Sequence, residues 1–331
     1  MTRLFQDDMF HELEGFLPSC KVLLKLESYN VGGSIKMKTA LALFDQLERT
    51  GQLSPNRAVI ESSSGNLGIA LAILCARKGL PFICVIDPNS LPCSRHIIES
   101  YGARLVLCEQ RDSNGGFLQG RIDLVKEMCM FDARLVWPNQ YANPANVEAH
   151  YKWTAPAIVR HHPDVAAIFV GVGTTGTLMG CAKYIQENAP GVRIVPVDSA
   201  GSVVFGQPAG IRHIPGMGSS RVPEIFDPRI AGKALLVPEI HGIQMCRLVA
   251  KRYGILIGGS TGSVLAGVVQ AYGNRDCPKK IVVISPDSGE RYLDTIYNDS
   301  WVKHRFPEFE PRAFATSDDH DLLLSHSGTP R

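Results

Sequence analysis

The sequence predicts an α/β protein with parallel sheets. Short apolar, β-branched runs alternate with helical patterns along the chain, and that alternation is typical of parallel α/β architecture. The apolar runs are short and nearly free of polar residues, which indicates sheets covered on both faces. The length of 331 residues leaves room for roughly two domains of about 150 residues each.

The elements can be placed in order from these runs. A helix is expected at 37–50, stopped by Gly51, and another at 67–78, ending at Gly79. Two more follow glycine-rich turns, at 178–188 and after 258–263. The last stretch, 311–331, mixes Ser, Asp, His, Gly and Pro and is expected to be a poorly ordered tail. The expected strands are 23–26, 58–60, 82–86, 104–107, 166–170, 194–197 and 281–284.

Composition excludes several classes of protein. The net charge is +2, and no basic cluster is longer than Lys279–Lys280, so a nucleic-acid partner is not expected. The longest apolar stretch, 67–76, is far short of the ~20 residues of a membrane-spanning helix. Residues 1–8 carry acids where a signal peptide is apolar. The nine cysteines include no Cys-x-x-Cys pair, which favours buried thiols in a reducing cytoplasm over a metal site or a disulfide framework.

The first of four turns that can carry chemistry is Gly32-Gly33-Ser34-Ile35-Lys36. Ser34 can cap the helix that follows. Lys36 would then lie in the first turn, where the positive end of the helix dipole lowers the pKa of an ammonium group and favours a nucleophilic amine. The alternative is a surface lysine near a helix start.

The second turn, 61–68, joins an expected strand to an apolar helix. Its serine hydroxyls and the free backbone N–H groups of the helix start form a site for a carboxylate or a phosphate. The alternative is a capped turn that binds nothing.

The third turn, 171–177, has the sequence Gly-Val-Gly-Thr-Thr-Gly-Thr. Glycines that admit a close ligand and threonine hydroxyls suit a phosphate. The same residues match Gly-x-Gly-x-x-Gly, and Asp198 follows about 20 residues later. An NAD-dependent dehydrogenase is therefore a competing interpretation. The fourth turn, 258–263, follows the apolar run 255–257 and is weak evidence alone.

Together the four turns resemble the cysteine synthase and cystathionine β-synthase family of pyridoxal-phosphate enzymes, which have fold type II (tryptophan synthase β-like). The resemblance covers roughly 20–301 and includes Gln-Tyr-Ala-Asn-Pro at 140–144, Pro-Gly-Met-Gly at 215–218 and Ser-Gly-Glu-Arg-Tyr-Leu at 288–293. The dehydrogenase explains only one motif of this set.

The resemblance implies a two-domain enzyme with the cofactor between the domains. The smaller, mobile domain would span 34–140, and the larger would comprise 1–33 and 141–310. Lys36 would hold pyridoxal phosphate as a Schiff base, Asn66 would bond the ring 3′ oxygen, and Ser260 would face the pyridine nitrogen. A homodimer is the family's expected state. The phosphate would be bound by Gly173, Thr174, Thr175, Gly176 and Thr177, and the substrate α-carboxylate by Ser63, Ser64, Asn66 and Gln140.

A serine at position 260 matters for the reaction. A neutral hydroxyl does not stabilise a protonated ring nitrogen, so the cofactor is a weaker electron sink and prompt loss of a β-leaving group is favoured. The implied reaction is β-replacement on an activated serine, with Lys36 moving the Cα proton.

Departures from the family pattern indicate the substrates. Tyr141 replaces a phenylalanine, Thr175 a glycine, Leu67 a threonine, and Arg121 a small residue. The arginine fork suits phosphate, which favours O-phospho-L-serine as the first substrate. The alternative for Arg121 is a solvated helix face.

These features, with Tyr-Leu-Asp at 292–294, are similar to a smaller group in the family, the N-(2-amino-2-carboxyethyl)-L-glutamate synthases. They join O-phospho-L-serine to L-glutamate, and a partner dehydrogenase then frees 2,3-diaminopropionate for siderophores or peptide antibiotics. Arg212, His213 and Arg221 are candidates for the glutamate carboxylates, with surface solvation as the alternative. A cysteine synthase using sulfide with O-acetylserine or O-phosphoserine remains a rival, as does a non-catalytic binding module.

Overall fold

The structure, a computed structural model, describes residues 4–273 and 275–309. It contains two sheets in which every strand pair is parallel except β1 with β2. The α/β prediction is thereby confirmed. The larger sheet runs β1 (Phe10–Glu12), β2 (Lys21–Leu26), β10 (Lys280–Ser285), β7 (Ala167–Gly171), β8 (Arg193–Ser199), β9 (Leu235–Val237), and the smaller runs β5 (Arg104–Leu107), β4 (Phe82–Ile86), β3 (Ala58–Ser62), β6 (Leu135–Val136).

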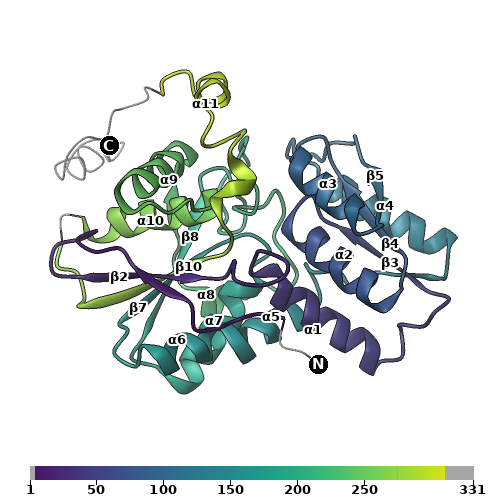
Figure 1. The fold of residues 1–331 in the computed structure, drawn as a ribbon, viewed down its shortest axis with the longest axis horizontal. Coiled ribbons are helices and arrows are strands. Elements are labelled where there is room, and N and C mark those ends of the chain that lie inside the picture. The colour runs from purple at the N-terminus through teal and green to yellow at the C-terminus, as the bar shows by residue number, and fades with distance from the viewer. Residues whose placement is uncertain (1–3, 274, 310–331) are drawn as a thin grey trace.

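Helices cover both faces of each sheet. In the larger lobe, α9 and α10 lie on one face and α6, α7 and α8 on the other (Figure 1). In the smaller lobe, α2 and α3 lie opposite α4 (Figure 1). The helices are α1 (Lys36–Arg49), α2 (Asn66–Lys78), α3 (Pro92–Ser100), α4 (Leu118–Phe131), α5 (Ala145–Ala149), the π-helix η1 (His150–Thr154), α6 (Ala155–His161), α7 (Gly176–Asn188), α8 (Pro228–Ala231), α9 (Glu239–Tyr253), α10 (Gly259–Tyr272), the 3₁₀ turn η2 (Gly289–Tyr292) and α11 (Asp299–Arg305).

The central strands have apolar interiors because both of their faces are covered. In β10, Ile281 and Val283 join the core beneath α9 and α10, while Val282 and Ile284 join the core on the opposite face. Successive side chains of a strand point to opposite faces. A strand without polar alternation therefore buries both sets, as the sequence predicted.

Three short strands were not expected from the sequence: β1, β6 and β9, of two or three residues each. The apolar run 255–257 forms only an isolated bridge, from Ile257 to Ser288. The predicted tail, 311–331, lies outside the described residues. Among the described residues, no helix is long and apolar enough to cross a membrane.

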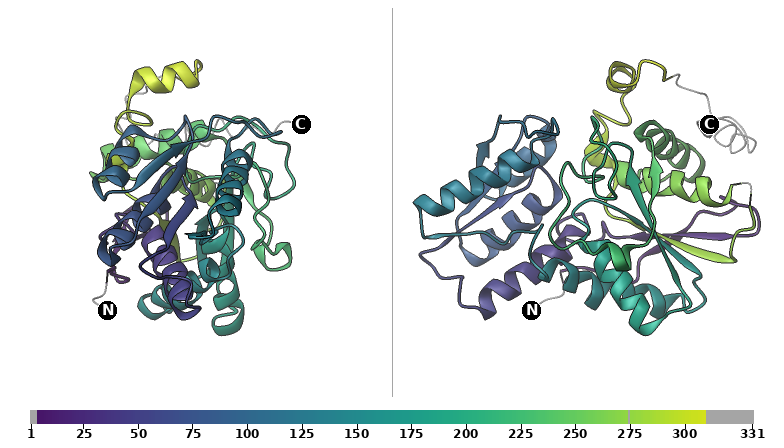
Figure 2. Two further views of the ribbon diagram at one scale, coloured as in Figure 1. Left: turned by 90° about the vertical axis from the view of Figure 1, so that its right-hand side faces the viewer. Right: turned by 180° about the vertical axis from the view of Figure 1, so that it is seen from behind.

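The two sheets form separate lobes that lie side by side (Figures 1 and 2). All strands of the smaller sheet fall within 58–136. The domain limits at 34, 140 and 310 stay predictions. The turns that follow β3, β7 and β10 supply residues to one cavity, as expected where parallel strands end.

Candidate active site

A cavity of about 690 Å³ is lined by residues from both lobes. Of the residues predicted to bind the cofactor or the first substrate, only Gly176 does not line the cavity; it packs against Asn146 instead. The structure thus brings together Lys36, Ser63, Ser64, Asn66, Arg121, Gln140, Tyr141, Gly173, Thr174, Thr175, Thr177 and Ser260.

Lys36 is the first residue of α1, half-buried, and lines the cavity. Burial lowers the pKa of its ammonium group, and the nearby Asp287 carboxylate raises it by less. The preceding turn requires glycine at position 33, where φ is +62° and a Cβ would lie 2.5 Å from the Arg291 guanidinium. A lysine held at the wall of a cavity with a depressed pKa can act as a nucleophile and as a base.

The expectation that Ser34 caps α1 is wrong. The residue at the N-cap position is Ile35, and no side chain caps the helix. Ser34 instead pairs its backbone with Asp287 as an isolated bridge. The Asn30 amide also holds Ser34, donating to its carbonyl oxygen over 2.9 Å. These contacts place Ser34 one position before the N-cap, so its hydroxyl does not cap the helix.

The turn between β7 and α7 is shaped for a phosphate. Thr175 adopts φ +68°, and its hydroxyl is buried without a hydrogen-bond partner among the described residues. A Cβ on Gly173 would lie 2.6 Å from the Gly216 carbonyl oxygen, and a Cβ on Gly176 2.3 Å from the Asn146 amide. The turn opens onto the first N–H groups of α7, which have no helical partner. Its donors and its orphaned hydroxyl fit a bound phosphate.

The second turn places its two serines differently. The Ser63 hydroxyl accepts a hydrogen bond from the Gly68 N–H over 2.9 Å and so steadies the start of α2. The Ser64 hydroxyl donates to Asp87 Oδ2 over 2.5 Å. Gln140 approaches the same turn, since its Nε2 donates to the Ser62 carbonyl oxygen over 3.2 Å. These groups surround the end of β3 and can bind a carboxylate.

Arg121 lies in α4 with 8% of its surface exposed, so the alternative of a solvated helix face is wrong. Its Nη1 donates to the Ser64 hydroxyl over 2.5 Å, and its Nε lies 3.2 Å from Asp87 Oδ2. Asp87 was not predicted from the sequence, although an acid directly after the predicted strand 82–86 belongs at the ligand edge of a parallel sheet.

Asp287 is a second carboxylate that the sequence analysis missed. It follows β10, lines the cavity and is buried, and burial raises its pKa. Oδ2 accepts from Asn66 Nδ2 over 2.7 Å and from the Tyr292 hydroxyl over 2.5 Å. Oδ1 has no hydrogen-bond partner among the described residues and would lie 1.9 Å from a Cβ on Gly258. The Asp287 carboxylate and Ser260 therefore line the same cavity.

Of the remaining predicted residues, all but Arg221 line the cavity. Tyr141 is buried against Leu118 and Ile122. Arg212 and His213 line the cavity, but Arg221 does not and pairs instead with Glu224 over 2.5 Å. Two further cations that line the cavity, and that the sequence analysis did not select, are Arg111 and Arg305.

A half-buried lysine at a helix start, a turn that fits a phosphate and a cavity between two parallel sheets define a cofactor-dependent α/β enzyme. The model of the family described as "Pyridoxal-phosphate dependent enzyme" matches residues 10–287. The chain therefore belongs to this family, in its cysteine synthase-like, fold type II branch.

Three relatives illustrate the similarity. Proteins named N-(2-amino-2-carboxyethyl)-L-glutamate synthase from Ralstonia nicotianae and from Cupriavidus metallidurans are each 40% identical, over 283 and 286 residues, which is 85% of this chain and 84% of theirs. The crystal structure of the cysteine synthase from Entamoeba histolytica superposes with a TM-score of 0.86 at 27% identity, covering 98% of this chain and 95% of that one.

The family membership settles the class of enzyme. The cofactor is pyridoxal phosphate, and the chain is of the β-replacement type. The competing interpretation as an NAD-dependent dehydrogenase is wrong. Asp198, on which it depended, is buried at the end of β8, with Oδ1 accepting from the Ser199 N–H over 2.8 Å.

Proposed function

We propose that the enzyme joins O-phospho-L-serine and L-glutamate through the amine, giving N-(2-amino-2-carboxyethyl)-L-glutamate and phosphate. The Cβ–O bond to phosphate breaks with its electron pair on oxygen. A bond forms between Cβ and the glutamate nitrogen, which loses a proton. The observation that carries this proposal is a buried arginine, Arg121, in the cavity wall. The two relatives with this printed name support it.

Lys36, Ser260 and the turn at 173–177 would hold the cofactor. When bound, pyridoxal phosphate supplies an electron sink for the substrate Cα. The Lys36 amine would attach it and then take and return the Cα proton, a role that its lowered pKa favours. The backbone N–H groups and the Thr175 hydroxyl would bind the phosphate group.

The α-carboxylate of the first substrate would bind at the end of β3, among Ser63, Ser64, Asn66 and Gln140. Arg121 and Tyr141 line the cavity next to this turn. Nη1 and Nε of Arg121 already contact Ser64 and Asp87, and a guanidinium has further N–H donors for the leaving phosphate. Asp87 offsets part of the positive charge, so the site would fix the phosphate by geometry as much as by charge.

Glutamate would enter at the mouth of the cavity. It carries two carboxylates, and Arg111, Arg212 and Arg305 all line the cavity. The product would pass to a partner dehydrogenase that releases 2,3-diaminopropionate for siderophore or peptide antibiotic synthesis. We expect a homodimer located in the cytoplasm.

The proposal is tested by the mass of the product. The holoenzyme is incubated with O-phospho-L-serine and glutamate, and in parallel with O-acetylserine and sulfide. We expect the glutamate adduct and stoichiometric phosphate in the first reaction. Rapid cysteine formation in the second, with no glutamate adduct in the first, would show a cysteine synthase instead.

A further inference from the structure

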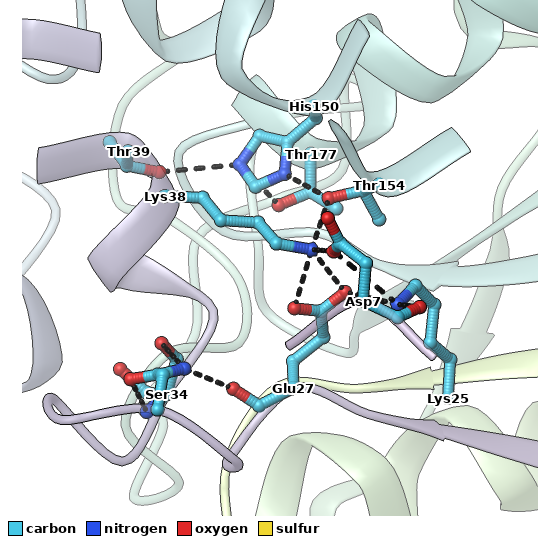
Figure 3. A network of polar contacts seen from close by, with 10 residues as sticks. Asp7, Lys25, Glu27, Ser34, Lys38, Thr39, His150, Thr154 and Thr177 are labelled. Atoms are coloured by element: carbon cyan, nitrogen blue, oxygen red, sulfur yellow. Dashed lines mark hydrogen bonds and ion pairs between the residues drawn. The ribbon is translucent and has the colours of Figure 1, made fainter. Parts of the chain in front are cut away.

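A buried cluster of four charged residues lies behind the cavity: Asp7, Lys25, Glu27 and Lys38 (Figure 3). Lys38 Nζ lies 2.8 Å from Glu27 Oε2 and also pairs with Asp7. Lys25 Nζ lies 3.1 Å from Glu27 Oε1. Lys38 therefore contacts two carboxylates, and an ammonium group can only donate hydrogen bonds.

A chain of hydrogen bonds leads from Lys38 toward the cofactor turn (Figure 3). Lys38 Nζ donates to the Thr154 hydroxyl over 3.4 Å, and that hydroxyl lies 3.0 Å from His150 Nδ1. His150 Nε2 lies 3.2 Å from the hydroxyls of Thr39 and of Thr177. Thr177 lines the cavity. The chain thus links the charged cluster to the turn that fits a phosphate.

Which atom donates in the bonds of Thr154 and His150 can be inferred from the donors around them. Because Thr154 accepts from Lys38, its own proton can be donated to His150 Nδ1. Burial and the charges of Lys36 and Lys38 keep the pKa of His150 well below its ordinary value, so the ring is neutral. A neutral ring with an acceptor at Nδ1 carries its proton at Nε2.

The Nε2–H group then donates toward the two threonine hydroxyls. Thr39 donates its own proton to Asn146 Oδ1 over 3.1 Å. Thr177 therefore accepts from His150 and keeps its proton for a ligand in the cavity. In the other tautomer, Nε2 would accept a hydrogen bond from the Thr177 hydroxyl. Thr177 could then no longer donate that proton to a phosphate.

We propose that His150 is a positioning residue whose Nε2–H tautomer, set by Lys38 through Thr154, makes the Thr177 hydroxyl a hydrogen-bond donor to the cofactor phosphate. The inference rests on the proposed role of the turn at 173–177. Gly180 of α7 allows His150 to pack closely, since a Cβ at position 180 would lie 2.7 Å from His150 Cβ. That close contact seats His150 against α7.

The tautomer is measured first, on the unmodified holoenzyme labelled with ¹⁵N at histidine. Two-bond ¹H–¹⁵N correlations distinguish the two neutral tautomers, and the His150→Gln spectrum assigns the signal. We expect the proton on Nε2. A proton on Nδ1, or a charged ring, would overturn the proposal whatever the variants show.

The second measurement is cofactor affinity, using apoenzyme with pyridoxal phosphate and with pyridoxal, which lacks the phosphate. Thr154→Val removes the donor to Nδ1, whereas Thr154→Ser keeps it. We expect Thr154→Val to raise the dissociation constant for pyridoxal phosphate about tenfold, as loss of a hydrogen bond to a charged group does. The affinity for pyridoxal should stay unchanged, and Thr154→Ser should behave as the unmodified enzyme.

A Thr177→Val variant separates two kinds of failure. If it leaves pyridoxal phosphate affinity unaltered, Thr177 does not bind the phosphate and the assignment of the turn is wrong. A second result would reject the role of His150. In it, Thr177→Val weakens the binding of pyridoxal phosphate, whereas Thr154→Val weakens the binding of neither ligand or weakens the binding of both equally.

Discussion

At the scale of single residues, two carboxylates determine how the cavity cations act. Asp87 contacts Arg121, and Asp287 lies near Lys36 and raises its pKa against the effect of burial. Asp87 therefore positions the Arg121 guanidinium, and Asp287 adjusts the pKa of the Lys36 amine.

Arg121→Ala should weaken the use of O-phospho-L-serine far more than that of O-acetylserine. Loss of a charge-assisted bond to phosphate costs about 1.5–3 kcal/mol, so kcat/KM for phosphoserine should fall at least about tenfold. Steady-state kinetics with both substrates measures this, with Arg121→Lys as the variant that keeps the charge. Equal losses with the two substrates would mean that Arg121 does not contact the leaving group.

Asp287→Asn should move the titration of Lys36 to lower pH. The neutral amine forms as pH rises through the Lys36 pKa, and the Asp287 carboxylate raises that pKa by favouring the ammonium. Removing the negative charge therefore lowers the pKa further. The rate at which apoenzyme captures pyridoxal, followed against pH, reports the midpoint. Asp45→Asn on the exposed side of α1 is the control, and a shift to higher pH in Asp287→Asn would contradict the electrostatic account.

At the scale of elements, the sequence predicted the strands that are buried on both faces and the helices between them. Periodicity found β10 because all of its interior is apolar. It missed β1, β6 and β9 because strands of two or three residues at or near a sheet edge depend on the neighbour they pair with. The Ser34 cap failed for a similar reason, since a distant bridge to Asp287 fixes that backbone.

The site was predictable where one turn carries a motif and unpredictable where distant segments meet. Most of the predicted residues line one cavity, because motif turns follow parallel strands. His150 could not be found, since its proposed role depends on η1, α7 and α1 meeting. Asp87 and Asp287 both follow predicted strands, so strand ends give a usable signal for buried acids.

The start of α1 depends on the charged cluster behind it. Lys38→Met leaves Asp7 and Glu27 with too little positive charge in a buried setting, which should cost about 3–5 kcal/mol of unfolding free energy. Urea denaturation measures the loss. Lys21→Met is the matched control, because Lys21 is 62% exposed and 3.7 Å from Glu12, and should change stability by under about 0.5 kcal/mol. A Lys38 variant as stable as the control would show that the cluster does not support the fold.

At the scale of the whole molecule, hydrogen bonds join the two lobes beside the cavity. The Ser220 hydroxyl of the larger lobe donates to Asp112 Oδ2 over 2.9 Å, and Asn114 Nδ2 donates to the Ser220 carbonyl oxygen over 2.6 Å. The segment that carries Asp112 leads into α4 and Arg121. We therefore propose that this contact between the lobes helps to position Arg121.

Ser220→Ala should loosen this contact. A lost hydrogen bond of about 1 kcal/mol corresponds to roughly fivefold more opening, so amide hydrogen exchange in 111–116 should be faster by about that factor. Ser100→Ala, which removes an exposed bond to the His96 carbonyl oxygen at the end of α3, is the control. Unchanged exchange in 111–116 would mean that the Ser220 contact does not hold the lobes together.

We propose that the amine at position 36, and not its neighbour at 38, carries the cofactor. Lys36 faces the cavity, whereas Lys38 is fully buried in ion pairs behind it. Borohydride reduction of the holoenzyme followed by peptide mapping tests this directly. We expect a pyridoxyl group on Lys36. A label on Lys38 or any other lysine, or no labelled peptide, would contradict it.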